Sequence, residues 1–210
     1  MTYAVKEMFL TLQGEGVNAG SRAVFVRFSG CNLWSGRERD RATAVCRFCD
    51  TDFVGVDGVG GGRFASADML AAAVEGYWGD GRDGRFVVLT GGEPMLQIDD
   101  AVVDALHAAD FRIAVESNGT LPTHPRIDWV CISPKAGSHV VQRRGDELKL
   151  VWPQAGIDPA ALEPWDFTHR LVQPLDDADA AANRTAAVAL VMDRPRWRLS
   201  LQTHKLLGMR

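Results

Sequence analysis

Short apolar runs recur along the chain and are separated by polar or glycine-rich segments. Runs that are apolar throughout, without strict alternation, are typical of strands covered on both faces. The sequence predicts eight such strands, at residues 3–9, 22–28, 85–89, 112–116, 127–132, 148–152, 170–173 and 197–201.

Three stretches between these runs have apolar residues at helical spacing. Ser66 is a suitable cap for a helix that runs to about Trp78, and Asp177 for a helix over 178–192. Residues 97–109 carry the third pattern, with Leu106 among its apolar positions. Strands that alternate with helices predict a parallel α/β sheet.

The balance of strands and helices narrows the fold further. A complete eight-stranded α/β barrel takes about 250 residues, whereas this chain has 210 and only three clear helices. We therefore expect an incomplete, TIM-like barrel of parallel strands with few helices, built as one domain over residues 1–210. The glycine-rich stretch 54–64 is predicted to be a flexible connection and not a domain boundary, because strands continue on both sides of it.

Composition and charge exclude several classes of protein. Hydrophobic residues make up 46% of the chain and the formal net charge is −4. A mildly acidic chain is a poor candidate for binding nucleic acid through a basic surface. No apolar run approaches the ~20 residues that a membrane span needs, and residues 1–9 lack the pattern of a secretory signal. A cytoplasmic protein without membrane attachment is expected.

Four cysteines are present, and three of them fall close together. Cys31, Cys46 and Cys49 are separated by 14 and two residues. Cysteine thiolates hold both iron–sulfur clusters and zinc, so this spacing alone leaves both open. Three thiolates would leave one iron of a four-iron cluster free for another ligand. Cys131 falls in a predicted buried strand and is expected to be a small core residue.

Polar or glycine-rich segments directly follow five of the predicted strands, at residues 29–31, 90–94, 116–120, 133–135 and 173–174. Parallel α/β folds place ligands beyond the carboxyl ends of their strands, so these segments are expected to meet at one rim. Each also has an ordinary interpretation. The turn at Gly91 and Gly92 could be a plain strand-to-helix turn, and Glu116 and Lys135 could be solvated side chains.

Arg27 lies within the apolar strand 22–28, where an unpaired charge would be costly. Alternation along the strand puts it on the opposite face from Val24, Val26 and Phe28. A structural ion pair and a ligand carboxylate are both reasonable partners.

The polar motifs together resemble a known superfamily. They are the segments 12–16 (LQGEG), 25–33 (FVRFSGCNL), 46–51 (CRFCDT), 90–94 (TGGEP), 116–119 (ESNG) and 133–135 (SPK). With them the chain resembles the radical S-adenosylmethionine (SAM) enzymes, and among these the 7-carboxy-7-deazaguanine synthase family. The resemblance implies conversion of 6-carboxy-5,6,7,8-tetrahydropterin to 7-carboxy-7-deazaguanine, with loss of ammonia, in queuosine or 7-deazapurine biosynthesis.

The resemblance also implies site residues and cofactors. A [4Fe-4S] cluster would be held by Cys31, Cys46 and Cys49, and Thr51 would contact Mg²⁺, although Thr51 could equally cap a turn. The SAM-binding residues would be Phe48, Cys49, Asp50, Gly92, Glu116, Ser133, Pro134, Lys135 and Gln173. The substrate-binding residues would be Leu12, Gln13, Gly14, Arg27, Thr90 and the terminal Arg210. A reductant such as flavodoxin and a homodimer are the expected partners.

One feature departs from the superfamily pattern, in which three residues usually separate the first two cysteines. Here the stretch 32–45 intervenes and is rich in charge, with Arg37, Arg39 and Arg41 among its residues. We expect it to form a surface excursion that returns the chain to the cluster. Three alternatives stay open: a radical SAM activase that makes a glycyl radical on a partner, a non-catalytic iron–sulfur carrier, and a zinc-stabilised binding module.

Overall fold

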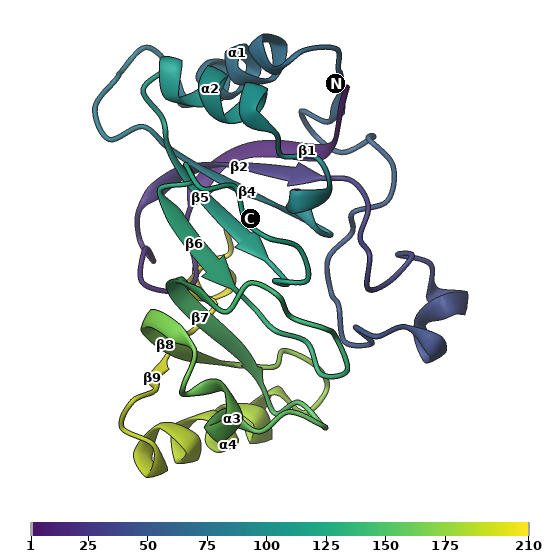
Figure 1. The fold of residues 1–210 in the computed structure, drawn as a ribbon, viewed down its shortest axis with the longest axis vertical. Helices are drawn as coiled ribbons and strands as arrows, with labels where there is room; N and C mark the ends of the chain where they lie inside the picture. The colour runs from purple at the N-terminus through teal and green to yellow at the C-terminus, as the bar shows by residue number, and fades with distance from the viewer. Residues whose placement is uncertain (1, 210) are drawn as a thin grey trace.

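The computed structural model describes residues 2–209 (Figure 1). Within them one nine-stranded sheet has the order β3-β1-β2-β4-β5-β6-β7-β8-β9. Its strands are β1 (Tyr3–Leu12), β2 (Arg22–Phe28), β3 (Gly62–Phe64), β4 (Phe86–Gly91), β5 (Arg112–Ser117), β6 (Trp129–Ile132), β7 (Arg144–Trp152), β8 (Asp166–Pro174) and β9 (Arg198–Leu199). From β2 to β9 neighbouring strands are parallel, whereas β1 is antiparallel to both β2 and β3.

The helices lie outside this curved sheet, which forms an open, partial barrel. They are α1 (Ala67–Trp78), α2 (Asp100–Ala108), α3 (Pro159–Leu162), α4 (Ala180–Asp193) and α5 (Thr203–Leu206), with 3-10 turns η1 (Glu38–Thr43) and η2 (Pro94–Leu96). In Figure 1, α1 and α2 pack together beside the β1-to-β5 half, and α3 and α4 lie at the β7-to-β9 end. The mixed α/β partial barrel confirms the fold predicted from the sequence. No helix among residues 2–209 is long and apolar enough to cross a membrane.

The helix caps show how local sequence sets these elements. Ser66 accepts a hydrogen bond from the Met69 amide at 3.2 Å and starts α1 as predicted. The second helix begins at Asp100 and not at Gln97, because the Gln97 amide side chain instead binds the backbone of Ala4 in β1. The last long helix begins two residues later than predicted, after Asp177 has accepted the Asp179 amide in a preceding turn.

The stretch 54–64 corrects one prediction, because it is not simply a flexible connection. It contains β3, which pairs with β1. A Cβ on Gly58 or Gly61 would lie 2.6 or 2.2 Å from the carbonyl oxygen of Lys6. These glycines therefore allow the segment to lie directly on the edge strand. The strand predicted at 197–201 is also shorter than expected, with only Arg198–Leu199 paired.

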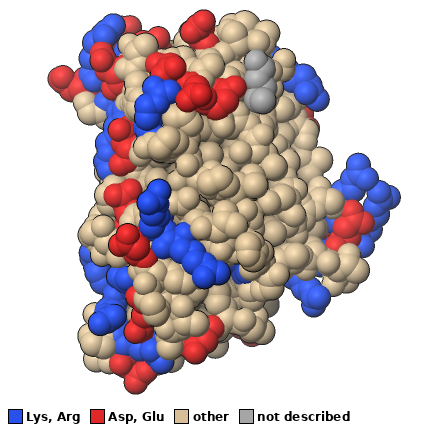
Figure 2. Space-filling model, in the orientation of Figure 1, with Lys and Arg blue, Asp and Glu red and all other residues tan. Residues whose placement is uncertain are grey.

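The excursion at 32–45 leaves and rejoins the fold at nearly the same point. The Leu33 carbonyl accepts the amides of Val45 and Cys46 at 3.1 and 3.4 Å. Between these ends, η1 forms the projection that carries a group of basic residues in Figure 2. The predicted surface excursion is therefore confirmed.

Candidate active site

A cavity of about 580 Å³ opens at the carboxyl ends of the parallel strands. The predicted rim exists: residues that follow β2, β4, β5, β6 and β8 all line it. So do all the predicted site residues except two. Pro134 does not line the cavity, since its carbonyl is turned toward the amide group of Gln154. Arg210 lies outside the described residues.

Three of the four cysteines face this cavity together. The Cys46 thiol hydrogen-bonds to Cys49, which raises the pKa of Cys46 and lowers that of Cys49 to about 6. Burial raises the pKa of the Cys31 thiol, which follows β2. Cys131 is apart from them: it is buried in β6 and its thiol donates to Glu147 at 3.4 Å. The expectation that Cys131 is a core residue is confirmed.

The geometry of the three thiols bears on what they can hold. Among residues 2–209, no three His, Cys, Asp or Glu side chains are arranged around a single ion. A single zinc ion needs ligands that converge on one point. A four-iron cluster instead takes each thiolate on a different iron. The three thiols line one cavity, and Cys46 and Cys49 are in hydrogen-bond contact there, so together they can supply three thiolates to one bound group.

Arg41 in the excursion supports the loop that carries Cys46 and Cys49. Its Nη1 donates to the carbonyl oxygens of Arg47 and Cys49, at 2.8 and 3.0 Å. Its guanidinium also lies over the Trp34 ring, 4.1 Å from the centroid. The excursion therefore packs against the loop that carries Cys46 and Cys49, which we call the cysteine loop, while η1 projects from the surface.

The turn after β4 is held close to Cys31. A Cβ on Gly92 would lie 2.2 Å from the Gly30 carbonyl oxygen and 2.7 Å from the Cys31 Cβ. The absence of a side chain at Gly92 is thus required by the protein's own backbone. Glu93, fully buried, accepts the Asn118 amide at 2.8 Å and ties this turn to the end of β5.

Arg27 and its strand neighbours follow the predicted alternation. Val24, Val26 and Phe28 are fully buried, while Arg27 faces the cavity. Its Nε donates to the Glu7 carboxylate at 2.8 Å, and its side chain is 21% exposed. Of the two partners considered from the sequence, the structural ion pair is present. The cavity-facing position leaves a ligand carboxylate as a second partner.

Lys135 and Gln173 are fixed by neighbouring polar groups. The Lys135 Nζ donates to the carbonyl and hydroxyl oxygens of Ser133, at 2.8 and 2.6 Å, and lies 5.9 Å from the centre of the Phe48 ring. Burial lowers the pKa of the Lys135 ammonium. The Gln173 side chain is buried and accepts the Ser200 hydroxyl at 3.1 Å.

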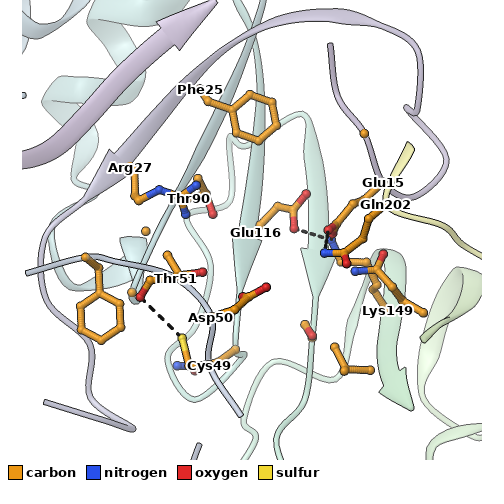
Figure 3. Close-up of a pocket in the computed structure, with 18 of the residues that line it drawn as sticks. Glu15, Phe25, Arg27, Cys49, Asp50, Thr51, Thr90, Glu116, Lys149 and Gln202 are labelled. Atoms are coloured by element: carbon orange, nitrogen blue, oxygen red, sulfur yellow. Dashed lines mark hydrogen bonds and ion pairs between the residues drawn. The ribbon is translucent and has the colours of Figure 1, made fainter. Parts of the chain in front are cut away.

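Glu116 belongs to a charged group that the sequence did not predict (Figure 3). Its carboxylate accepts from Lys149 at 2.5 Å, and Lys149 also pairs with Glu15 at 2.6 Å. Gln202 completes the group by donating to Glu15 at 2.8 Å. The one signal for Lys149 in the sequence is that it is a lysine inside the apolar run 148–152.

The segment that precedes Arg210 also reaches the cavity. Thr203 donates its amide to the Gly14 carbonyl at 2.8 Å, and His204 packs against Gly14. Lys205 pairs with Asp176, after β8, and with Asp50, at 2.5 and 3.3 Å. This segment therefore spans from the end of β8 to the loop between β1 and β2 (residues 13–21, the first loop) and to the cysteine loop. Its residues have no motif in the sequence that would have identified them.

Comparison with known proteins places the chain in a family. No family model matches the chain. A 7-carboxy-7-deazaguanine synthase from Caulobacter vibrioides is 61% identical over 209 residues, which cover 100% of both chains. The chain belongs to the 7-carboxy-7-deazaguanine synthase family. The synthase from Bordetella pertussis is 57% identical, again over 100% of both chains.

A solved structure agrees with this membership in the 7-carboxy-7-deazaguanine synthase family. QueE from Escherichia coli superimposes with a TM-score of 0.73 and 28% sequence identity. The match covers 97% of this chain and 95% of the other. The similarity therefore extends over the entire partial barrel.

Proposed function

We propose that this chain is a 7-carboxy-7-deazaguanine synthase of the radical SAM class. It converts 6-carboxy-5,6,7,8-tetrahydropterin to 7-carboxy-7-deazaguanine with loss of ammonia, as a carbon–nitrogen lyase. Membership in the family supports the reaction. The observation that carries the class is the meeting of three cysteines and the polar strand ends at one cavity of about 580 Å³.

Cys31, Cys46 and Cys49 would hold a [4Fe-4S] cluster, leaving one iron for SAM. When bound, the cluster and SAM would supply hydrogen-atom transfer, in which a hydrogen is taken from the substrate and later returned to the product radical, so that SAM is recycled. The protein's part is to bind, orient and exclude water. We assign SAM to the side of the cavity lined by Phe48, Asp50, Gly92, Glu116, Ser133, Lys135 and Gln173.

The remaining wall would hold the substrate. Arg27 faces the cavity next to Thr90 and can offer a planar guanidinium to the substrate carboxylate (Figure 3). Leu12 at the end of β1 and Gln13 and Gly14 in the first loop line this wall. Thr51 lies on the cysteine loop, between these two sides, and its hydroxyl would be one of several oxygen ligands of Mg²⁺.

The domain organisation, cellular location and partners of the enzyme are also proposed. We propose one catalytic domain over residues 1–210, in the cytoplasm, acting as a homodimer with a reductant such as flavodoxin. Exposed apolar side chains such as Met192 on α4 and Leu206 on α5, at 80% and 76% exposure, are candidates for contact with a second copy.

Anaerobic reconstitution tests the function directly. The protein is loaded with iron and sulfide and given SAM, dithionite and 6-carboxy-5,6,7,8-tetrahydropterin, and the product is identified by its mass. Formation of 7-carboxy-7-deazaguanine with SAM recovered intact is expected. Cleavage of SAM without conversion of the pterin would contradict the proposed substrate, and absence of iron would contradict the proposed class.

A further inference from the structure

Lys149 is a buried cation in the middle of an otherwise apolar strand. Its side chain is 4% exposed and reaches the cavity from β7. Burial would lower the pKa of its ammonium, but the carboxylates of Glu116 and Glu15 raise it well above its usual value. Burial would likewise raise the pKa of Glu15, yet Lys149 lowers it to about 2. Lys149 and Glu15 are therefore both charged at neutral pH.

The two carboxylates that share Lys149 come from different parts of the proposed site. Glu116 lies near the carboxyl end of β5 and belongs to the side assigned to SAM. Glu15 lies on the first loop, directly after the residues assigned to the substrate. In Figure 3, both carboxylates point toward Lys149, while Arg27 and Thr90 lie at the other end of the view. Lys149 is thus the ion-pair link between the two sides.

A second set of hydrogen bonds closes a ring through the same residues. Gln13 donates its side-chain amide to Glu116 at 2.9 Å. Its side-chain oxygen accepts the Glu15 amide at 3.1 Å. A group that holds Glu116 in one orientation therefore also restrains Lys149 and Gln13, and through both of them the first loop.

We infer that Lys149 is a positioning residue that makes binding of SAM at Glu116 and binding of substrate at the first loop strengthen each other. This inference rests on the proposed function. SAM that fixes the Glu116 carboxylate would leave less motion to lose when substrate binds, so each ligand raises the affinity of the other. Such a coupling is reciprocal, and it is typically 5- to 150-fold.

The measurement is the affinity for SAM with and without 6-carboxy-5,6,7,8-tetrahydropterin. Anaerobic calorimetry on the reconstituted protein, with its cluster oxidised so that no turnover occurs, gives both dissociation constants. The wild type is expected to bind SAM at least about fivefold more tightly when the pterin is present. In Lys149→Met this ratio should fall close to one.

Two further variants distinguish a positioning role of Lys149 from a general effect on the stability of the protein. Glu15→Gln removes one charge from the group while keeping its shape, so it carries the test if Lys149→Met does not fold, and it should also reduce the ratio. Arg85→Met is the matched control. Arg85 is 5% exposed and pairs with Glu75 at 2.8 Å, and it does not line the cavity. It should preserve the wild-type ratio.

Several results would overturn the inference. Equal loss of both affinities in Lys149→Met and Glu15→Gln, with the ratio unchanged, would make the role purely structural. A ratio that collapses in Arg85→Met as well would show that any loss of stability abolishes it. If wild type binds both ligands without coupling, the inference fails and the proposed function stands. If SAM binds but the pterin does not, both fail.

Discussion

Arg27→Lys separates the two interpretations of the arginine that faces the cavity. In the structure the guanidinium donates its Nε hydrogen to Glu7 at 2.8 Å, so a planar group can hold Glu7 while its terminal nitrogens address a substrate carboxylate. A lysine ammonium is a single point of charge. It can keep the Glu7 pair or reach the substrate, but it cannot reproduce both contacts in the same geometry.

The size of the effect follows from the lost contact. Losing a hydrogen bond to a charged group costs about 1.5–3 kcal/mol. At about 1.4 kcal/mol per factor of ten, kcat/KM should fall about ten- to hundredfold. The assay is anaerobic turnover of the carboxypterin, with SAM affinity measured in parallel. SAM binding should stay at the wild-type value, because Arg27 lies on the substrate side.

The control lies on the same strand. Arg22 is exposed, points away from the cavity and binds the Trp78 carbonyl, so Arg22→Lys should keep wild-type turnover. If Arg27→Lys loses SAM affinity as strongly as pterin turnover, the residue serves only to hold the strand and Glu7 in place. Wild-type turnover in Arg27→Lys would likewise refute the carboxylate contact.

Three further predictions concern the cysteine loop and its surroundings. Alanine at any of the three cavity cysteines should abolish turnover and lower bound iron, whereas Cys131→Ala should retain iron; the reverse pattern in iron analysis would refute the assignment. Removing divalent metal with a chelator should slow the wild type but change Thr51→Ala much less, and full activity of chelated, iron-replete wild type would exclude Mg²⁺. Gly92→Ala should reduce iron content, because its Cβ would lie 2.2 Å from the Gly30 carbonyl oxygen; normal loading in the folded variant would contradict that close approach.

The local pattern of apolar and polar residues predicted the sheet well, because its strands are short apolar runs followed by polar or glycine-rich segments. The residues after β2, β4, β5, β6 and β8 could be placed at one rim without coordinates, since parallel strands share an end. Boundaries were less accurate wherever a side chain outside the element decided them. Gln97 is the clearest example, because it has a helical pattern but uses its amide to bind Ala4 in β1 and Ser29 directly after β2.

Two parts of the site depend on contacts between distant residues and could not be read from local pattern. The role of Lys149 follows only from the position of β7 opposite the first loop, since its partner Glu15 is 134 residues away in the sequence. Gln202, His204 and Lys205 lie in a polar segment whose position is set by the Gly14 carbonyl across the open side of the barrel. Nothing in their spacing specifies that partner.

The excursion at 32–45 returns to Leu33, near where it begins, so its length can differ among related chains. Because backbone hydrogen bonds join the returning end of the loop, at Val45 and Cys46, to the Leu33 carbonyl near its start, the number of residues between these ends is not constrained by the thiols. Lengthening a three-residue connection to 14 is slightly more than two doublings, which costs about 1.4 kcal/mol of closure entropy. The contacts of Arg41 with the Trp34 ring and with the cysteine loop can offset a closure cost of that size. Insertions at this position should therefore be nearly neutral in evolution, and a search pattern with a fixed cysteine spacing would pass over chains whose thiols still meet.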